Sequence, residues 1–302
     1  MRIFARSIKL GLLTSATAII LASCGNSEIE SSPKDNATAT AANTLPPIAD
    51  YLACLPQETA LLAAHRGSAR NSKYPENSMS ALNALLKKGY LLTEIDVAGL
   101  NDGVHILYHD GVWDEKSTGR GSLAATTWKE AQKLLLMDTK GNFSADLPVK
   151  LEDYLKAAKG NIYVEVDFKS SSKYETVIKQ IRANHMASQV ILISYSEGQT
   201  KKLSRLAPDM MLSVSSREAL GQTRFKVGQV AAWIGYDLDD KALIGNLQDK
   251  DIPIIGRVRK NWDLSAAKAA DILVTDNIFN HKPIAGLNKK NKETLDNCLA
   301  EL

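Results

Sequence analysis

Short apolar runs recur between residues 60 and 275, and segments with helical periodicity separate most of them. Runs of four to eight apolar residues that stop at polar residues are typical of strands buried on both faces of a sheet. Nine runs have this character: 60–64, 91–97, 104–108, 162–169, 190–195, 211–215, 230–236, 252–258 and 272–275. Their alternation with helices predicts an α/β fold. Residues 51–302 are long enough for a (β/α)8 TIM barrel with its site at the carboxyl ends of the strands.

One part of the pattern does not fit a regular barrel. Nine candidate strands exceed the eight that such a barrel needs. A crossover between parallel strands takes a dozen or more residues, usually as a helix, and residues 96–105 are too few for one. We therefore expect an irregular (β/α)8 TIM barrel, with the irregularity near this segment.

The first run ends at the tripeptide HRG, residues 65–67, so a core strand presents a base, a cation and a flexible residue at its end. The sequence PENS follows at 75–78, where the proline stops the preceding chain and Asn77 or Ser78 can cap a helix. That helix has apolar side chains on one side and ends at Gly89, so we expect it mainly to pack.

The second run, LLTEIDV, carries two acids spaced by two residues. This spacing points Glu94 and Asp96 to the same face of one strand, and the flanking apolar residues make an exposed edge strand a poor alternative. Two carboxylates on one face repel each other unless a cation lies between them. Oxygen ligands suit a hard divalent ion, so the pair predicts a Ca²⁺ or Mg²⁺ site.

Two further strands end in ionisable residues. The run 104–108 leads into His109 and Asp110, although Gly111 also allows a simple turn there. In IYVEVDFK, alternation places Glu165, Asp167 and Lys169 on one face of a strand. Burying these charges unpaired would cost about several kcal/mol each. We therefore favour an arrangement in which a metal ion binds the acids and an anionic ligand binds the lysine. A local ion pair on an exposed strand is the alternative.

Taken in order, these motifs resemble the glycerophosphodiester phosphodiesterase family. Its members carry an HRG, a PEN(T/S), an E-x-D, a DG followed by HD, and later an acid-x-Lys strand. The resemblance continues in STGRGSLAATTWKEAQKL and in the late ILVTDN, and it covers roughly residues 60–283. It implies metal-dependent hydrolysis of a glycerophosphodiester to sn-glycerol 3-phosphate and an alcohol.

The resemblance also implies a role for each matching residue. His65 and His109 correspond to the family's general acid/base pair, and Arg66 and Lys169 to its phosphate contacts. Glu94 and Asp96 correspond to two of its metal ligands. The third acidic ligand is Asp167 by its spacing to the lysine, or Glu165 two residues earlier. The attacking group can be the substrate's own glycerol hydroxyl, which gives a cyclic phosphate that water then opens.

The N-terminus has the pattern of a bacterial lipoprotein precursor. Three basic residues precede an apolar stretch at 10–22, and the sequence LASC around Cys24 resembles a lipobox. We expect residues 1–23 to be a signal peptide, Cys24 to be lipidated, and residues 24–50 to be a disordered tether of polar and small residues. Gly25, in place of an aspartate, favours the outer over the inner membrane of the envelope. An ordinary cleaved signal with an unrelated cysteine is the alternative.

Charge and cysteine content refine this picture. Without residues 1–23 the chain has 34 basic and 34 acidic residues, so nucleic-acid binding has no electrostatic support. Cys54 and Cys298 remain near the two ends of the barrel. In an oxidising periplasm they could form a disulfide, which would stabilise by roughly 4 to 5 kcal/mol in the entropic description. Two free thiols are the alternative.

Two other functions fit the same residues. A phospholipase-D-like hydrolase of lysophospholipids or sphingolipids would suit a membrane-anchored member with an apolar rim around its site. A non-catalytic envelope lipoprotein could instead keep the barrel for binding alone. The intact set of histidines, acids and lysine argues against the second of these.

Overall fold

The computed structural model describes residues 45–56, 58–67, 72–221, 225–226, 228–258, 264–279 and 282–301. The predicted signal peptide, Cys24 and most of the predicted tether lie outside these residues. No helix in the described ranges combines the length and apolar character needed to cross a bilayer.

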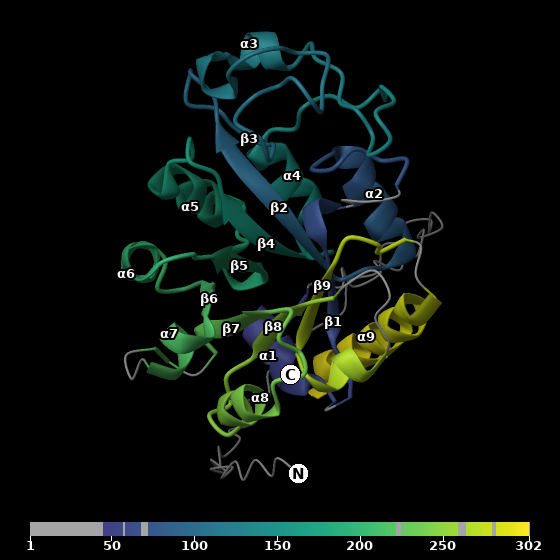
Figure 1. Ribbon diagram of the computed structural model, residues 1–302, viewed down its shortest axis with the longest axis vertical. Coiled ribbons are helices and arrows are strands. Elements are labelled where there is room, and N and C mark those ends of the chain that lie inside the picture. The colour runs from purple at the N-terminus through teal and green to yellow at the C-terminus, as the bar shows by residue number, and fades with distance from the viewer. Residues whose placement is uncertain are drawn as a thin grey trace, which may run out of the picture. The chain divides into compact units, whose positions relative to one another are not determined.

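Eight parallel strands close into a barrel surrounded by helices (Figure 1). Around the barrel the strands are β1 (Leu61–Ala64), β9 (Ile272–Thr275), β8 (Ile254–Arg257), β7 (Val230–Gly235), β6 (Met211–Ser215), β5 (Val190–Ile193), β4 (Tyr163–Phe168) and β2 (Leu92–Gly99). The pairing of β1 with β2, with Ala63 opposite Leu92, closes the ring. The predicted TIM barrel is confirmed.

The ninth predicted strand is not part of the ring. β3 (His105–Leu107) runs antiparallel to β2, with Val97 opposite Leu107 and Gly99 opposite His105. The chain therefore rises along β2 and returns along β3, so no crossover helix is needed between them. This hairpin is the irregularity that the short spacing predicted.

Helices follow most strands and pack on the outside of the barrel. They are α2 (Met79–Lys88), α4 (Leu151–Ala158), α5 (Tyr174–Ala183), α6 (Glu197–Leu206), α7 (Ser216–Gly221), α8 (Lys241–Gln248) and α9 (Lys282–Glu301). α2 begins where predicted, because the Ser78 hydroxyl accepts a hydrogen bond from the Ala81 amide, and it ends at Gly89 with a positive φ of 68°. The segment after β3 contains the short α3 (Trp128–Ala131) and a small core around the buried Trp113.

Alternation along the strands separates the inside of the barrel from the layer beneath the helices. In β4, Val164 and Val166 belong to the helix-covered core, whereas Tyr163 belongs to the core inside the barrel. Glu165 and Asp167 share the parity of Tyr163 and point inward. The strand that carries the charges is thus buried on both faces.

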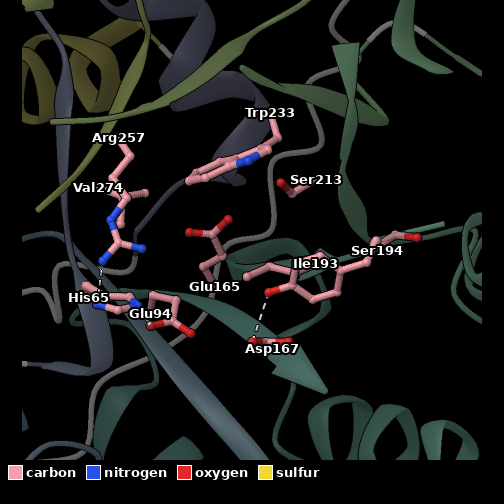
Figure 2. A pocket seen from close by; sticks show the side chains of 11 residues that line it. His65, Glu94, Glu165, Asp167, Ile193, Ser194, Ser213, Trp233, Arg257 and Val274 are labelled. Atoms are coloured by element: carbon pink, nitrogen blue, oxygen red, sulfur yellow. Dashed lines mark hydrogen bonds and ion pairs between the residues drawn. The ribbon is translucent and has the colours of Figure 1, made fainter. Parts of the chain in front are cut away.

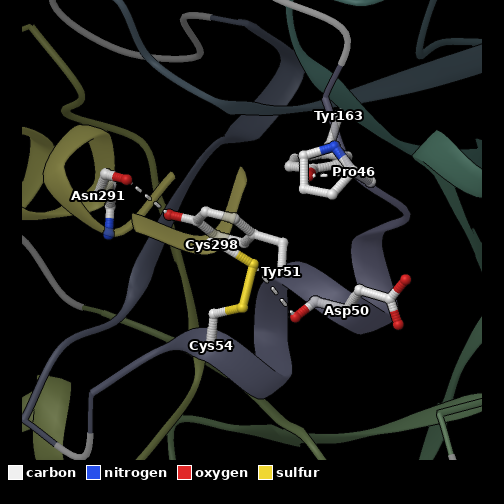
Figure 3. The surroundings of a disulfide bond; sticks show 7 residues. All are labelled: Pro46, Asp50, Tyr51, Cys54, Tyr163, Asn291 and Cys298. Carbon is white, nitrogen blue, oxygen red and sulfur yellow. Dashed lines mark hydrogen bonds between the residues drawn. A yellow bond between two sulfur atoms is a disulfide. The ribbon is translucent and has the colours of Figure 1, made fainter. Parts of the chain in front are cut away.

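The amino-terminal end of the barrel is closed by α1 (Ile48–Cys54). This helix begins before residue 51, the predicted start of the barrel, so residues 48–50 belong to the fold and not to the predicted tether. Its buried residues Ile48, Tyr51 and Leu52 pack against the first inward residues of the strands. Cys54 at its end forms a disulfide with Cys298 of α9, with the two Cα atoms 5.9 Å apart (Figure 3). Both termini of the barrel are therefore fixed at the end opposite the carboxyl ends of the strands.

Candidate active site

The carboxyl ends of the strands surround a cavity of about 200 Å³ (Figure 2). Its wall includes His65 after β1, Glu94 of β2 and two acids of β4. Residues from β5 to β9 complete the wall, namely Ile193, Ser194, Tyr195, Ser213, Trp233, Arg257 and Val274. The cavity lies at the end of the barrel where TIM barrels hold their ligands.

His65 is oriented by an aspartate from the far end of the chain. Its Nδ1 lies 2.6 Å from Oδ1 of Asp276, which directly follows β9. Because a carboxylate only accepts, Nδ1 carries the proton and Nε2 is turned to the site, 3.9 Å from Oε2 of Glu94. Arg257 also contacts this aspartate, with Nη2 3.0 Å from Oδ1 and 3.2 Å from Oδ2.

The environment of His65 favours the neutral imidazole. Burial lowers its pKa below the ordinary value, Arg257 and Arg66 lower it further, and the hydrogen bond to Asp276 works in the opposite direction. The lowering of this pKa by desolvation and two nearby cations is therefore larger than the increase caused by one carboxylate. A neutral imidazole at neutral pH can accept a proton at Nε2.

Three acidic side chains form the group that the sequence predicted. Carboxylate oxygens of Glu94, Asp96 and Asp167 lie within 4.8 Å of one another, and all three residues are buried. The register of β2 and β4 contributes to this, since it places Asp96 opposite Asp167 and Glu94 opposite Glu165. The structure thus brings Asp167 to the pair on β2, and Glu165 does not belong to this group among the described residues.

The donor set fits a hard divalent ion. It consists of carboxylate oxygens, and Oδ1 of Asp167 is a buried acceptor without a hydrogen-bond partner in the described part of the chain. Burial and the charge of Asp96 raise the pKa of Glu94 well above its ordinary value. A cation at this position would relieve both the repulsion and the unsatisfied oxygen.

Two cations already contact the acids. Nζ of Lys169 lies 2.6 Å from Oδ1 of Asp96 and 2.7 Å from Oδ2 of Asp167. Nε of Arg66 lies 3.4 Å from Oδ2 of Asp96, and its backbone amide donates to Glu94 Oε2 at 2.7 Å. Burial raises the pKa of Asp96, but Lys169 and Arg66 outweigh it, so this carboxyl titrates below its ordinary range.

The second histidine belongs to an adjoining group of charges. Nδ1 of His109 lies 2.5 Å from Oδ1 of Asp110, whose other oxygen is 3.1 Å from Nζ of Lys116. Lys116 also lies 2.6 Å from Glu76, which Arg66 contacts at 3.3 Å. A chain of ion pairs therefore links His109 to the acidic group, and a small recess lies between Glu76 and His109.

Sequence reasoning missed several residues that hold the site together. The sequence predicts Asn77 as a possible helix cap, but its Nδ2 donates to Oδ2 of Asp96 at 2.7 Å and its Oδ1 accepts from the Asp96 amide at 3.0 Å. Tyr195 donates to Oδ2 of Asp167 at 2.9 Å. Tyr195, Arg257 and Asp276 all lie at the carboxyl ends of predicted strands, which was the available signal.

A sequence model of the Glycerophosphoryl diester phosphodiesterase family matches residues 65–234. This stretch is more than half of the chain and contains both histidines and all the acids on β2 and β4. The chain belongs to this family.

Individual relatives extend the comparison. A protein of Mycobacterium tuberculosis called probable glycerophosphodiester phosphodiesterase 2 is 28% identical over 157 residues, which are 52% of this chain and 56% of that protein. The chain thus matches little more than half the length of this relative. A family enzyme from Parabacteroides distasonis has a similar fold, with a TM-score of 0.68 at 20% identity over 84% of this chain and 93% of that one.

A second solved structure is that of an Oleispira antarctica phosphodiesterase in complex with the product sn-glycerol-3-phosphate. It has a TM-score of 0.61 at 18% identity and covers 82% of this chain and 99% of that one. At these identities the two structures support the fold of the barrel.

Proposed function

We propose that the chain hydrolyses glycerophosphodiesters to sn-glycerol 3-phosphate and an alcohol, with the help of a divalent cation. The observation that carries this proposal is the convergence of three buried acids, two cations and a carboxylate-bound histidine at one mouth of the barrel. The product bound to the Oleispira relative supports the same substrate class.

The first task of such a site is to neutralise the phosphodiester, which is an anion that repels nucleophiles. Arg66 and Lys169 each lie beside the acidic group and could contact the phosphate oxygens. Glu94, Asp96 and Asp167 would hold Ca²⁺ or Mg²⁺, which supplies Lewis-acid stabilisation of developing negative charge when bound. Asn77 keeps Asp96 in place through its two hydrogen bonds.

The second task is proton transfer. Nε2 of His65 forms no hydrogen bond with the described residues, and the hydrogen bond from Nδ1–H to Asp276 fixes this tautomer. One imidazole takes the proton of the attacking hydroxyl as its oxygen bonds to phosphorus, and the other protonates the departing alkoxide. We assign these two roles to His65 and His109 as a pair. When the substrate's own glycerol hydroxyl attacks, the cyclic phosphate that forms is opened by water.

A substrate panel tests the proposal. The purified protein is stripped with a chelator and assayed with glycerophosphocholine, glycerophosphoethanolamine and lysophosphatidylcholine, before and after addition of Ca²⁺ or Mg²⁺. We expect sn-glycerol 3-phosphate from the first two only after the ion is added. Release of choline with lysophosphatidate would instead favour a phospholipase-D-like activity, and activity indifferent to the ion would contradict the role of the acids.

A pair of histidine variants separates catalysis from binding. His109→Ala should abolish turnover, whereas His185→Ala, at an exposed position after α5, should leave it unchanged. Turnover that survives His109→Ala would argue against the acid/base pair, and a chain that hydrolyses no diester at all would favour a binding lipoprotein.

The lipid anchor is a separate part of the proposal. The LASC sequence before Gly25 supports lipidation of Cys24, and therefore a place in the bacterial envelope on the periplasmic side. We expect metabolic incorporation of labelled palmitate and recovery in the outer-membrane fraction. Cys24→Ser should abolish both, and label retained by that variant would contradict the assignment.

A further inference from the structure

The wall of the cavity contains polar groups that the proposed catalysis does not use. Glu165 is 1% exposed and lines the cavity, and its carboxyl has no hydrogen bond or ion pair within the described residues. Figure 2 shows this carboxyl in the middle of the view, with Trp233 and Ser213 on one side and His65 and Glu94 on the other. The carboxyl therefore faces the cavity and can form hydrogen bonds with what fills it, either water or a ligand.

Two neighbours of this carboxyl are also without partners. The hydroxyl of Ser213, a residue 2% exposed, and the indole N–H of Trp233 form no hydrogen bond in the described part of the chain. Both residues come from adjacent strands, β6 and β7, with Ser213 opposite Ala231 in the register. Ser194 on β5 differs, because its hydroxyl is bonded to Thr200 at 2.8 Å and to the Ser196 carbonyl at 3.2 Å.

The chemistry of these groups selects a class of ligand. A serine hydroxyl donates and accepts, an indole N–H only donates, and a carboxyl can bond a hydroxyl whether it is ionised or protonated. A ligand with adjacent hydroxyls can satisfy all three. A trimethylammonium group has no hydrogen-bonding capacity, so it would leave the serine and the indole buried without partners.

We propose that Glu165, Ser213 and Trp233 form a subsite that binds the free hydroxyls of the glycerol half of the substrate. This assignment rests on the proposed function, which places the phosphate at His65, Arg66 and Lys169. His65, Glu165, Ser213 and Trp233 line the same cavity, so a phosphate held beside His65 leaves the attached glycerol within that cavity, next to the other three residues. The subsite therefore determines specificity for a diol on that half.

Water explains why an apolar chain would not substitute for glycerol. A cavity of about 200 Å³ far exceeds the roughly 10–15 Å³ that one water needs, and the polar groups on its wall can bind water when no ligand is present. A ligand that displaces such waters without replacing their hydrogen bonds loses affinity. Discrimination against a ligand without hydroxyls follows.

Calorimetric binding of two matched ligands tests the subsite. The full chain, with Ca²⁺ or Mg²⁺ present throughout, is titrated with sn-glycerol 3-phosphate and with n-propyl phosphate, which share the phosphate and the three carbons but differ in two hydroxyls. Interactions with the phosphate cancel in the ratio of the two Kd values. We expect sn-glycerol 3-phosphate to bind at least about tenfold more tightly.

Variants then assign the preference to residues. Ser213→Ala should reduce the ratio several-fold, and Glu165→Leu should bring it close to one. Ser194→Ala, a matched serine of the same cavity wall whose hydroxyl is bonded within the protein, should keep the full ratio. Melting temperatures identify any variant that fails to fold. Ser213→Ala removes one oxygen from a strand and keeps the test usable if Glu165→Leu does not fold.

The outcomes separate this inference from the proposed hydrolysis. Equal affinity for the two phosphates in a chain that hydrolyses diesters would overturn the subsite alone. Tighter binding of phosphocholine than of sn-glycerol 3-phosphate, lost in Glu165→Leu, would overturn it in favour of a cation site. If the chain hydrolyses no diester but shows the predicted ratio of the two Kd values, the proposed reaction is contradicted. Recognition of glycerol phosphate by the subsite is then still supported.

Discussion

His65 and Asp276 are 211 positions apart in the sequence, yet their Nδ1 and Oδ1 atoms lie 2.6 Å apart. The closure of the barrel produces this contact. β1 and β9 are paired in parallel with Ala64 opposite Thr275, so the next residue of each strand meets its counterpart. The orientation of the histidine is therefore set by strand register and depends on the ring being closed.

Replacing the aspartate should damage catalysis without removing the histidine. In Asp276→Asn the amide can still accept from Nδ1, but a neutral group stabilises the imidazolium less than a carboxylate does. We expect kcat/KM to fall roughly 10²-fold, within the about 10²–10⁴-fold that general acid–base catalysis contributes. Initial rates with glycerophosphocholine measure this change.

The same variant has a predictable pH profile. Asp276 raises the pKa of His65 against the lowering effects of burial and Arg257, so its removal lowers that pKa further. The limb of the pH–rate profile that reports this histidine should move to lower pH. Asp209→Asn, which breaks an exposed ion pair with Arg182, is the matched control and should leave rate and profile unchanged. A limb that moves to higher pH would contradict the assigned contact.

Metal binding should be visible as stability. An ion that binds only the folded chain at 100 times its Kd adds about 2.7 kcal/mol to the free energy of unfolding. We expect Ca²⁺ or Mg²⁺ to raise the melting temperature of the chelated protein. Asp167→Asn should abolish this increase and Glu165→Gln should retain it, because only Asp167 lies in the acidic group. The reverse result would make Glu165 the third ligand.

Glu165 should limit stability at neutral pH. Burial and the charge of Asp167 raise its pKa from 4.5 to about 8. The folded protein therefore holds this proton more tightly than the unfolded chain. The stability from that proton is fully present below pH about 4.5 and is lost as pH rises through about 8. We expect Glu165→Gln to have a higher melting temperature than the unaltered chain, and the difference should increase as the pH rises across this range.

Melting in chelator at several pH values measures the effect. Glu152 on α4 is exposed and bonded to Lys156, so Glu152→Gln provides a matched surface control in which we expect no such trend. A difference between Glu165→Gln and the unaltered chain that stays constant from pH about 5 to about 8 would contradict the assigned titration.

The disulfide should stabilise the barrel without affecting turnover. Cys54 and Cys298 join α1 to α9 at the amino-terminal end, away from the cavity. We expect a reductant, or the double change of both residues to serine, to lower the free energy of unfolding by about 2–5 kcal/mol. The turnover number kcat should be unaffected. Sensitivity of the double variant to reductant would show that another group is responsible.

The sequence was a good guide wherever a local pattern sufficed. All nine predicted strands are present, because each is an apolar run bounded by polar residues. The spacing of Glu94 and Asp96 correctly placed both on one face, and the short segment before His105 correctly indicated an irregular connection. These features depend on neighbours within one strand or one turn.

Other features depend on register between strands that are distant in sequence. The register of β4 with β2 places each of its two acids opposite an acid of β2, and the positions of the side-chain oxygens then select Asp167 over Glu165. Asp276 and Arg257 meet His65 only after the ring closes. Asn77 looked like a helix cap because its side-chain bonds to Asp96 span two separate elements.

The hairpin of β2 and β3 allows the segment that follows it to vary in sequence and length. β3 brings the backbone back beside β2, where the Tyr108 amide donates to the Asp96 carbonyl at 3.0 Å, and His109 follows at once. The excursion that comes next packs largely around its own Trp113. The length and the side chains of that segment can therefore change during evolution, and with them the surface that a ligand meets at the mouth of the barrel. The position of the His109 imidazole would stay the same.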